Sequence, residues 1–174
     1  MTFFSVKQSE KEAALLYILK DIIKVPINLD PINDDVKSKS AKSNSKNTAH
    51  ALFSHQTIIF VSTKYHVEYI TNLLNVAGYK TSYIYGSLDQ AARTMQINSF
   101  RNGQTNLLVV TDVAARGIDI PILENVINYD FVGSSKVFVH RVGRTARAGR
   151  RGWAYSLIAP EEVFVISNRI IIFV

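Results

Sequence analysis

Residues 106–119 read Asn-Leu-Leu-Val-Val-Thr-Asp-Val-Ala-Ala-Arg-Gly-Ile-Asp, and this stretch decides the fold. Its first six residues form a nearly continuous apolar and β-branched run, which is typical of a strand buried on both faces. Asp112, Arg116 and Asp119 then occupy the exit of that strand. Ligands of parallel sheets bind at the carboxyl ends of strands, so the stretch predicts a ligand-facing loop. Polar strand exits also cap helices or satisfy backbone donors, and that alternative stays open here.

The sequence on both sides of this stretch alternates short buried strands with amphipathic helices. Helices of about 10–14 residues between such strands indicate an α/β fold, with a parallel sheet covered by helices on both faces. The predicted strands cover residues 2–6, 57–62, 81–85, 106–111, 125–129 and 153–159, and the predicted helices cover residues 8–24, 64–77, 90–101 and 134–147.

Composition divides the chain into four segments. Residues 1–29 hold the first strand and helix, and residues 30–54 are rich in Lys, Ser and Asn, which predicts a flexible insertion. Residues 55–166 form the predicted core, and residues 167–174 are an atypical tail. A length of 174 residues fits one α/β domain with its own core rather than a complete two-domain enzyme.

Positive charge gathers in two windows of the sequence. The chain has 20 Lys and Arg against 14 Asp and Glu; four of the cations lie in residues 36–50 and six in residues 131–160, and neither window contains a carboxylate. Local positive charge on a mildly acidic body predicts an anionic partner such as nucleotide or nucleic acid. The lysines of the first window either contact RNA or serve only as solvated charges in a loop.

Several classes of site are excluded by what the sequence lacks. There is no cysteine, and the four histidines have no metal-ligand spacing, so we expect no disulfide, no thiol nucleophile and no metal site. The apolar runs are too short to span a bilayer, which predicts a soluble intracellular protein with no membrane partner. Neither G-x-x-x-x-G-K-[ST] nor G-x-G-x-x-G occurs, so another domain must hold the phosphates of any nucleotide.

The predicted helix over residues 134–147 carries the sharpest chemical signal. At 3.6 residues per turn His140, Arg144 and Arg147 share one face, and Arg141 is displaced to the side. Guanidinium groups are permanently charged and bidentate, which suits them to phosphate and to the charge that develops during phosphoryl transfer. The alternative is a solvated basic helix face.

Four ordered segments resemble the C-terminal RecA-like domain of DEAD-box ATP-dependent RNA helicases. They are Ile58–Thr63, Gln90–Arg93, Thr111–Asp119 and His140–Arg147. The resemblance implies a RecA-like sheet and identifies the chain as one half of an RNA helicase that hydrolyses ATP. The phosphate loop and the Asp-Glu-Ala-Asp segment are absent from the sequence, so we expect no hydrolysis by residues 1–174 alone.

On the ATP side the resemblance implies a role for five residues. Arg144 and Arg147 would be arginine fingers, and His140 would couple their helix to an N-terminal RecA-like domain. Asp119 would bind the ribose of ATP, and Arg116 would order the cleft through carboxylates of that other domain. The cofactors implied are ATP and Mg²⁺, with the Mg²⁺ ligands supplied by the N-terminal domain.

On the RNA side the resemblance implies contacts from Gly86, Arg93 and Thr111. Such contacts go to sugar and phosphate, so RNA binding should be insensitive to sequence and sensitive to salt. The alternative function, from another class, is a non-catalytic RNA-binding or docking module of helicase ancestry.

A few positions suggest a branch of the family. Residues 85–93 together with residues 144–149 most resemble the nucleolar branch that acts in ribosome biogenesis. This implies pre-ribosomal particles as partners and a location in the nucleus and nucleolus. One departure from the common pattern is Ala146, which stands where glycine is commoner.

Overall fold

The computed structural model describes residues 1–27, 55–116, 118, 123–132, 134–146, 151–160 and 162. The predicted insertion at residues 30–54 and the predicted tail at residues 167–174 lie outside these ranges. The domain boundaries drawn from composition therefore stay predictions.

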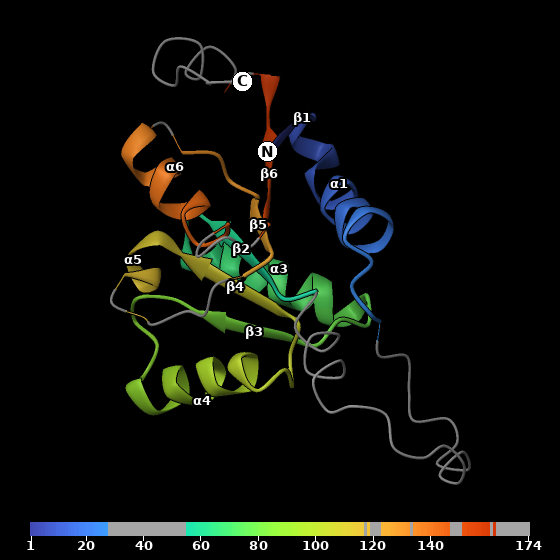
Figure 1. The fold of residues 1–174 in the computed structure, drawn as a ribbon. Helices are drawn as coiled ribbons and strands as arrows, with labels where there is room; N and C mark the ends of the chain where they lie inside the picture. The colour runs from blue at the N-terminus through green and yellow to red at the C-terminus, as the bar shows by residue number, and fades with distance from the viewer. Residues whose placement is uncertain are drawn as a thin grey trace, which may run out of the picture.

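The described strands form one parallel sheet of six strands in the order β1-β6-β5-β2-β4-β3 (Figure 1). All of β2 and all of β4 are buried, as continuous apolar strands in the middle of a covered sheet require. The predicted parallel sheet is confirmed. The strands are β1 (Thr2–Ser5), β2 (Thr57–Val61), β3 (Thr81–Ile84), β4 (Leu107–Thr111), β5 (Asn125–Asn128) and β6 (Trp153–Ile158).

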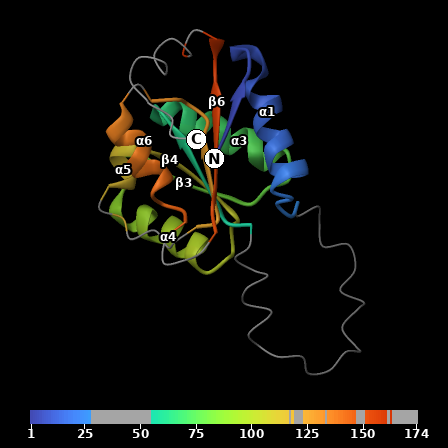
Figure 2. The same ribbon diagram turned by 45° about the horizontal axis from the view of Figure 1, so that its top comes forward.

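Helices cover both faces of the sheet, as Figure 2 shows with the strands near edge-on. One face carries α1 and α3, and the other carries α4, α5 and α6. The arrangement is the predicted α/β fold with helices on both faces. The helices are α1 (Lys11–Tyr17), α3 (Lys64–Val76), α4 (Gln90–Arg101), α5 (Asp112–Ala115) and α6 (Ser135–Val142).

Alternate residues of each central strand supply the two apolar cores. Ile59 and Val61 of β2 pack with α1 and α3, while Ile58 and Phe60 pack with Phe100 of α4 and with α5. Side chains alternate between the two faces of a strand, so a strand that is apolar throughout must have cover on both faces. No described helix is long and apolar enough to cross a membrane.

The first predicted helix is not a single α-helix. Residues 8–24 contain a 3₁₀ turn η1 (Gln8–Glu10), then α1, then a π-helical turn η2 (Ile18–Ile22). The backbone N–H of Ile23 donates to the carbonyl of Ile18, five residues earlier, at 2.8 Å. Lys24 then takes a left-handed conformation with φ 61°, which stops the helix before Pro26.

The predicted helix over residues 134–147 is also shorter than expected. It ends at Val142, where Gly143 forms the C-cap. Thr145 instead pairs with Leu123 in an isolated parallel bridge, and its hydroxyl donates to the Leu123 carbonyl at 2.7 Å. These contacts draw the chain away from the helix axis, so the expected single helical face through Arg147 is wrong.

Candidate functional site

The carboxyl ends of the parallel strands place several polar residues along one edge of the sheet. Ser62 follows β2, Gly86 lies two residues beyond β3, Asp112 follows β4, and Asp130 lies two residues beyond β5. The edge of a parallel sheet where the strands end is where ligands of such folds bind. Most of the predicted site residues are on or next to the segments that leave this edge.

The predicted RNA residues lie together at the exits of β3 and β4. Arg93, near the start of α4, donates through Nη2 to the carbonyls of Tyr85 and Gly86, each at 3.3 Å. Its Nε is buried and has no hydrogen-bond partner in the described part of the chain. Thr111 is buried at the end of β4, which pairs with β3. The structure therefore brings Arg93 against Gly86 at the exit of β3, and Thr111 ends the neighbouring strand β4.

A shallow cavity of about 360 Å³ extends from Arg93 along α4. Its described lining contains cations and amides but no carboxylate: Gln90, Arg93, Thr94, Ile97, Asn98, Arg101 and Ile118. Arginine and amide donors are the groups that contact phosphate oxygens in nucleic-acid interfaces. The chemistry of this lining is consistent with a sugar–phosphate ligand.

His140 and Arg144 meet even though the helix ends between them. His140 is exposed near the end of α6, and the guanidinium of half-buried Arg144 lies against its Nε2. The backbone of Arg144 is held at both ends, since its N–H donates to Arg141 at 3.0 Å and its carbonyl accepts from Leu123 at 3.1 Å. The Arg144 side chain therefore extends from a backbone that is held in place, and it lies beside the exposed imidazole of His140.

The remaining predicted ATP residues are described only in part. Arg116 is exposed at the end of α5, where the backbone becomes extended. Asp119 and Arg147 lie outside the described residues, so their predicted roles are not tested by the structure. The described chain resumes at Leu123, which bonds to Arg144 and Thr145. Leu123 therefore lies against the turn that carries Arg144.

Arg141 is the largest difference between the expected and the observed site. The sequence pattern placed it at the side of a basic face, but its side chain is 0% exposed. Its Nε and Nη2 donate to the two carboxylate oxygens of Asp112, both at 2.7 Å, and its guanidinium carbon lies 5.0 Å from the centre of the Phe60 ring. Asp112 therefore neutralises an internal arginine, which is neither the ligand contact nor the capping of a helix or of backbone donors that the sequence left open.

Asp130 is a second carboxylate with internal partners, and unlike Asp112 it is buried; the sequence analysis missed it. Its Oδ2 accepts from the backbone N–H of Ser62 and lies 2.7 Å from Nδ1 of His66. Its own carbonyl accepts from Nη1 of Arg141 at 2.7 Å. The signal in the sequence was the position of Asp130 directly after the predicted strand over residues 125–129, the same signal that marked Asp112 after β4.

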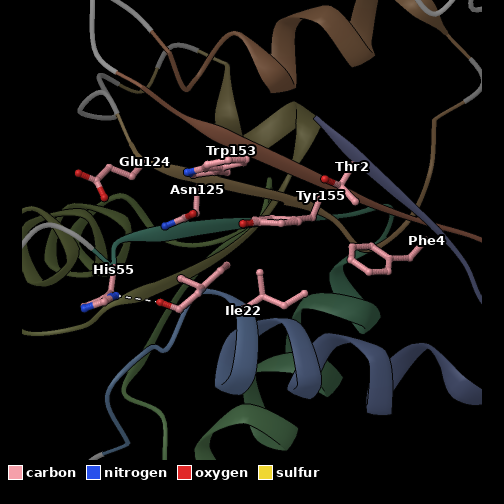
Figure 3. Close-up of a pocket in the computed structure, with 9 residues that line it drawn as sticks. Thr2, Phe4, Ile22, His55, Glu124, Asn125, Trp153 and Tyr155 are labelled. Carbon is pink, nitrogen blue, oxygen red and sulfur yellow. Dashed lines mark hydrogen bonds between the residues drawn. The ribbon is translucent and has the colours of Figure 1, made fainter. Parts of the chain in front are cut away.

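A larger cavity of about 430 Å³ lies at the opposite edge of the sheet (Figure 3). Thr2, Asn125 and Trp153 line it from the amino ends of β1, β5 and β6, and His55 bonds to the carbonyl of Ile23 at its rim. It contains none of the predicted site residues. Its position at the amino ends of the strands makes it a poor candidate for the ligand site of a parallel sheet.

The described residues fit a phosphate ligand better than a metal ion. They contain no group of three or more His, Cys, Asp or Glu that could hold a metal. The carboxylates of Asp112 and Asp130 are already engaged by Arg141, Ser62 and His66.

Comparison with known proteins gives consistent results. The family described as the helicase conserved C-terminal domain matches residues 42–149. The chain is 59% identical over 167 residues to the ATP-dependent RNA helicase dbp10 of Schizosaccharomyces pombe, and 55% identical over 174 residues to that of Aspergillus fumigatus. Each alignment covers 92% of this chain and 20% of the relative, so the chain spans about a fifth of their length.

Solved structures of the same kind share the fold. The E. coli DEAD-box protein SrmB, bound to regulator of ribonuclease activity A, is 32% identical with a TM-score of 0.71, and the match covers 95% of this chain and 80% of that one. S. cerevisiae Dbp5 bound to RNA and ADP BeF3 is 27% identical with a TM-score of 0.69, and the match covers 96% of this chain and 37% of that one.

Proposed function

Because this chain belongs to the family of helicase conserved C-terminal domains, in its DEAD-box branch, we propose that it is the phosphate-sensing half of an ATP-dependent RNA helicase. In this proposal ATP and Mg²⁺ bind between this domain and an N-terminal RecA-like domain, which holds the triphosphate and supplies the Mg²⁺ ligands. RNA lies across both domains. Closure of the cleft places Arg144 and Arg147 at the γ-phosphate.

The observation that carries the proposal is the joining of two distant segments at one place. Arg144 and Thr145 bond to Leu123, and Arg141 bonds to Asp112, so the segment after β4 and the turn after α6 form one unit. In the sequence, Arg116 and Asp119 follow β4, while His140, Arg144 and Arg147 lie in α6 or shortly after it. A fixed backbone at Arg144 meets the requirement that an arginine finger be positioned before the reaction.

The RNA half of the proposal rests on the exits of β3 and β4. Arg93 lies against the carbonyls of Tyr85 and Gly86 and lines the cavity along α4, whose described lining contains no carboxylate. Thr111 ends the neighbouring strand. Contacts from these positions would reach the sugar–phosphate backbone, which accounts for RNA binding without sequence preference.

We assign the full-length protein to ribosome biogenesis in the nucleolus, with pre-ribosomal particles as its partners. The support is the resemblance of residues 85–93 and 144–149 to that branch of the family, together with the 55–59% identity to the dbp10 helicases named above. Sedimentation of the tagged protein with large-subunit precursors tests this assignment. Recovery only in fractions free of ribosomal precursors would contradict it.

The test of the catalytic role is ATP hydrolysis by the full-length protein. Arg144→Ala and Arg147→Ala should each slow RNA-stimulated hydrolysis by about 10³–10⁵-fold, the usual contribution of an arginine finger. The matched control is Arg151→Ala, at an exposed arginine of the same basic window, which should hydrolyse ATP like the wild type. Turnover near the wild-type value in both finger variants would favour the non-catalytic RNA-binding module instead.

A further inference from the structure

Arg141 forms more contacts than a salt bridge alone would require. Besides the bidentate pair with Asp112, its Nη1 donates to the carbonyl of Asp130 at 2.7 Å and to Oδ1 of Asn128 at 3.3 Å. Asn128 in turn donates to Oγ of Ser156 at 2.9 Å. Four hydrogen bonds from one buried guanidinium therefore join α6 to the segments that leave β4 and β5, with the Phe60 ring of β2 beneath.

The partners of Arg141 lie on the side proposed to bind RNA. Asp112 follows Thr111 directly, and the Asp130 carboxylate holds the backbone of Ser62 and the imidazole of His66 beyond β2. Arg141 itself is the neighbour of His140 and precedes Arg144 by three residues. The guanidinium thus stands between the strand exits and the turn assigned to ATP.

We propose that Arg141 is a positioning residue that fixes Arg144 relative to the strand exits that contact RNA. The inference rests on the proposed function. A side chain that is 0% exposed cannot itself reach a phosphate, so Arg141 acts only through the backbone it anchors. The Arg144 N–H donates to the carbonyl of Arg141, so a shift of α6 at Arg141 is passed directly to Arg144.

The geometry requires arginine at this position. A planar guanidinium can bind both oxygens of Asp112 and a carbonyl at the same time, whereas a lysine ammonium is a point charge that cannot reproduce the bidentate pair. Arg141→Lys should therefore keep the internal charge but lose the fixed orientation of α6. Displacements of about 1 Å at a reacting group can cost about 10²-fold in rate, so a small loss of orientation is measurable.

The experiment measures RNA-stimulated ATP hydrolysis and RNA affinity in the full-length protein. Arg141→Lys should lower kcat by about tenfold or more while the RNA concentration for half-maximal stimulation changes little, because Arg93 and Gly86 are held by α4 and β3. The exposed control Arg151→Lys should leave both quantities unchanged. Thermal unfolding of each variant shows whether it is folded at the assay temperature.

A double-mutant cycle with Arg144→Ala separates positioning from general stability. If Arg141 acts through Arg144, Arg141→Lys should cost a much smaller factor in the Arg144→Ala background than in the wild type. An equal factor in both backgrounds, or an unchanged kcat in folded Arg141→Lys, would overturn the inference while leaving the proposed function intact. No loss of hydrolysis in Arg144→Ala alone would instead refute the proposed finger.

Asp112→Asn provides a second variant in case Arg141→Lys does not fold. The amide keeps the size of the side chain and one acceptor oxygen, so it should weaken the bidentate pair and reproduce the fall in kcat to a smaller extent. If neither variant is folded at the assay temperature, Arg141 is required for the fold as a whole and the positioning role is rejected.

Discussion

Replacing Gly152 with alanine should destabilise the turn that carries Arg144 without touching any residue assigned to ligand binding. A Cβ at this position would lie 1.8 Å from Oγ1 of Thr145 and 2.6 Å from the backbone nitrogen of Ala146. The Thr145 hydroxyl cannot simply rotate away, because it donates to the carbonyls of Leu123 and Glu124 at 2.7 and 3.1 Å. The backbone of Ala146 cannot move without moving Arg144.

The expected cost follows from these contacts. Forcing a methyl group into a closely packed site costs about 1–3 kcal/mol, and disturbing the buried hydrogen bonds of Thr145 adds about 1 kcal/mol. The sum of about 2–4 kcal/mol corresponds to a fall in Tm of about 4–16 °C for a domain of this size.

Thermal and urea unfolding of the isolated chain, followed by circular dichroism, measures this loss. The matched control is Gly86→Ala, where a Cβ would meet only Cγ1 of Val113 at 3.9 Å. The control should stay within about 0.5 kcal/mol of the wild type. A Gly152→Ala variant as stable as Gly86→Ala would refute the close approach of residue 152 to Thr145.

Three further predictions concern single positions. Ala146 has φ 55°, a conformation that costs an L-residue about 1–2 kcal/mol. Glycine adopts this conformation without that cost but loses more backbone entropy on folding. Ala146→Gly should therefore raise the free energy of unfolding by about 0.5–1 kcal/mol, measured by urea titration. Gly86→Ala should weaken RNA binding, measured by fluorescence anisotropy, although the variant folds normally. An undiminished affinity would argue against close approach of the RNA backbone to residue 86. Burial and then the Glu12 carboxylate raise the pKa of Tyr129 above its ordinary 10.0, so stability present at neutral pH is lost as the pH rises above about 10. Tyr129→Phe should make that decline shallower when urea unfolding is repeated across the alkaline range.

The sequence alone was sufficient to predict the strands and the protein family. Continuous apolar strands such as residues 57–61 and 107–111 must be covered by helices on both faces of the sheet, and the structure buries both of them completely. The ordered motifs were equally decisive, because each stands at a strand exit or helix that the comparisons match to helicase C-terminal domains. The placement of Gly86 and Arg93 together also followed from local order, since both lie within one strand–helix connection.

The sequence alone did not predict where the helices end or which charged side chains are buried. Helical periodicity extended a face through Arg147, but Gly143 and the bridge between Leu123 and Thr145 ended the helix at Val142. Helix ends depend on which backbone groups find partners outside the helix, and those partners come from distant parts of the chain.

By itself the sequence determined a parallel α/β sheet, the order of its motifs and an excess of positive charge for an anionic partner. Only the tertiary structure decided which cations are available to that partner. Arg141 and Arg144 are three residues apart and chemically identical, yet one is 0% exposed against Asp112 and the other lies half-buried beside His140. The difference arises because Asp112 lies 29 residues before Arg141 and meets it only when the folded chain brings the start of α5 to α6. Burial of a charge requires such a partner, and no local pattern contains it.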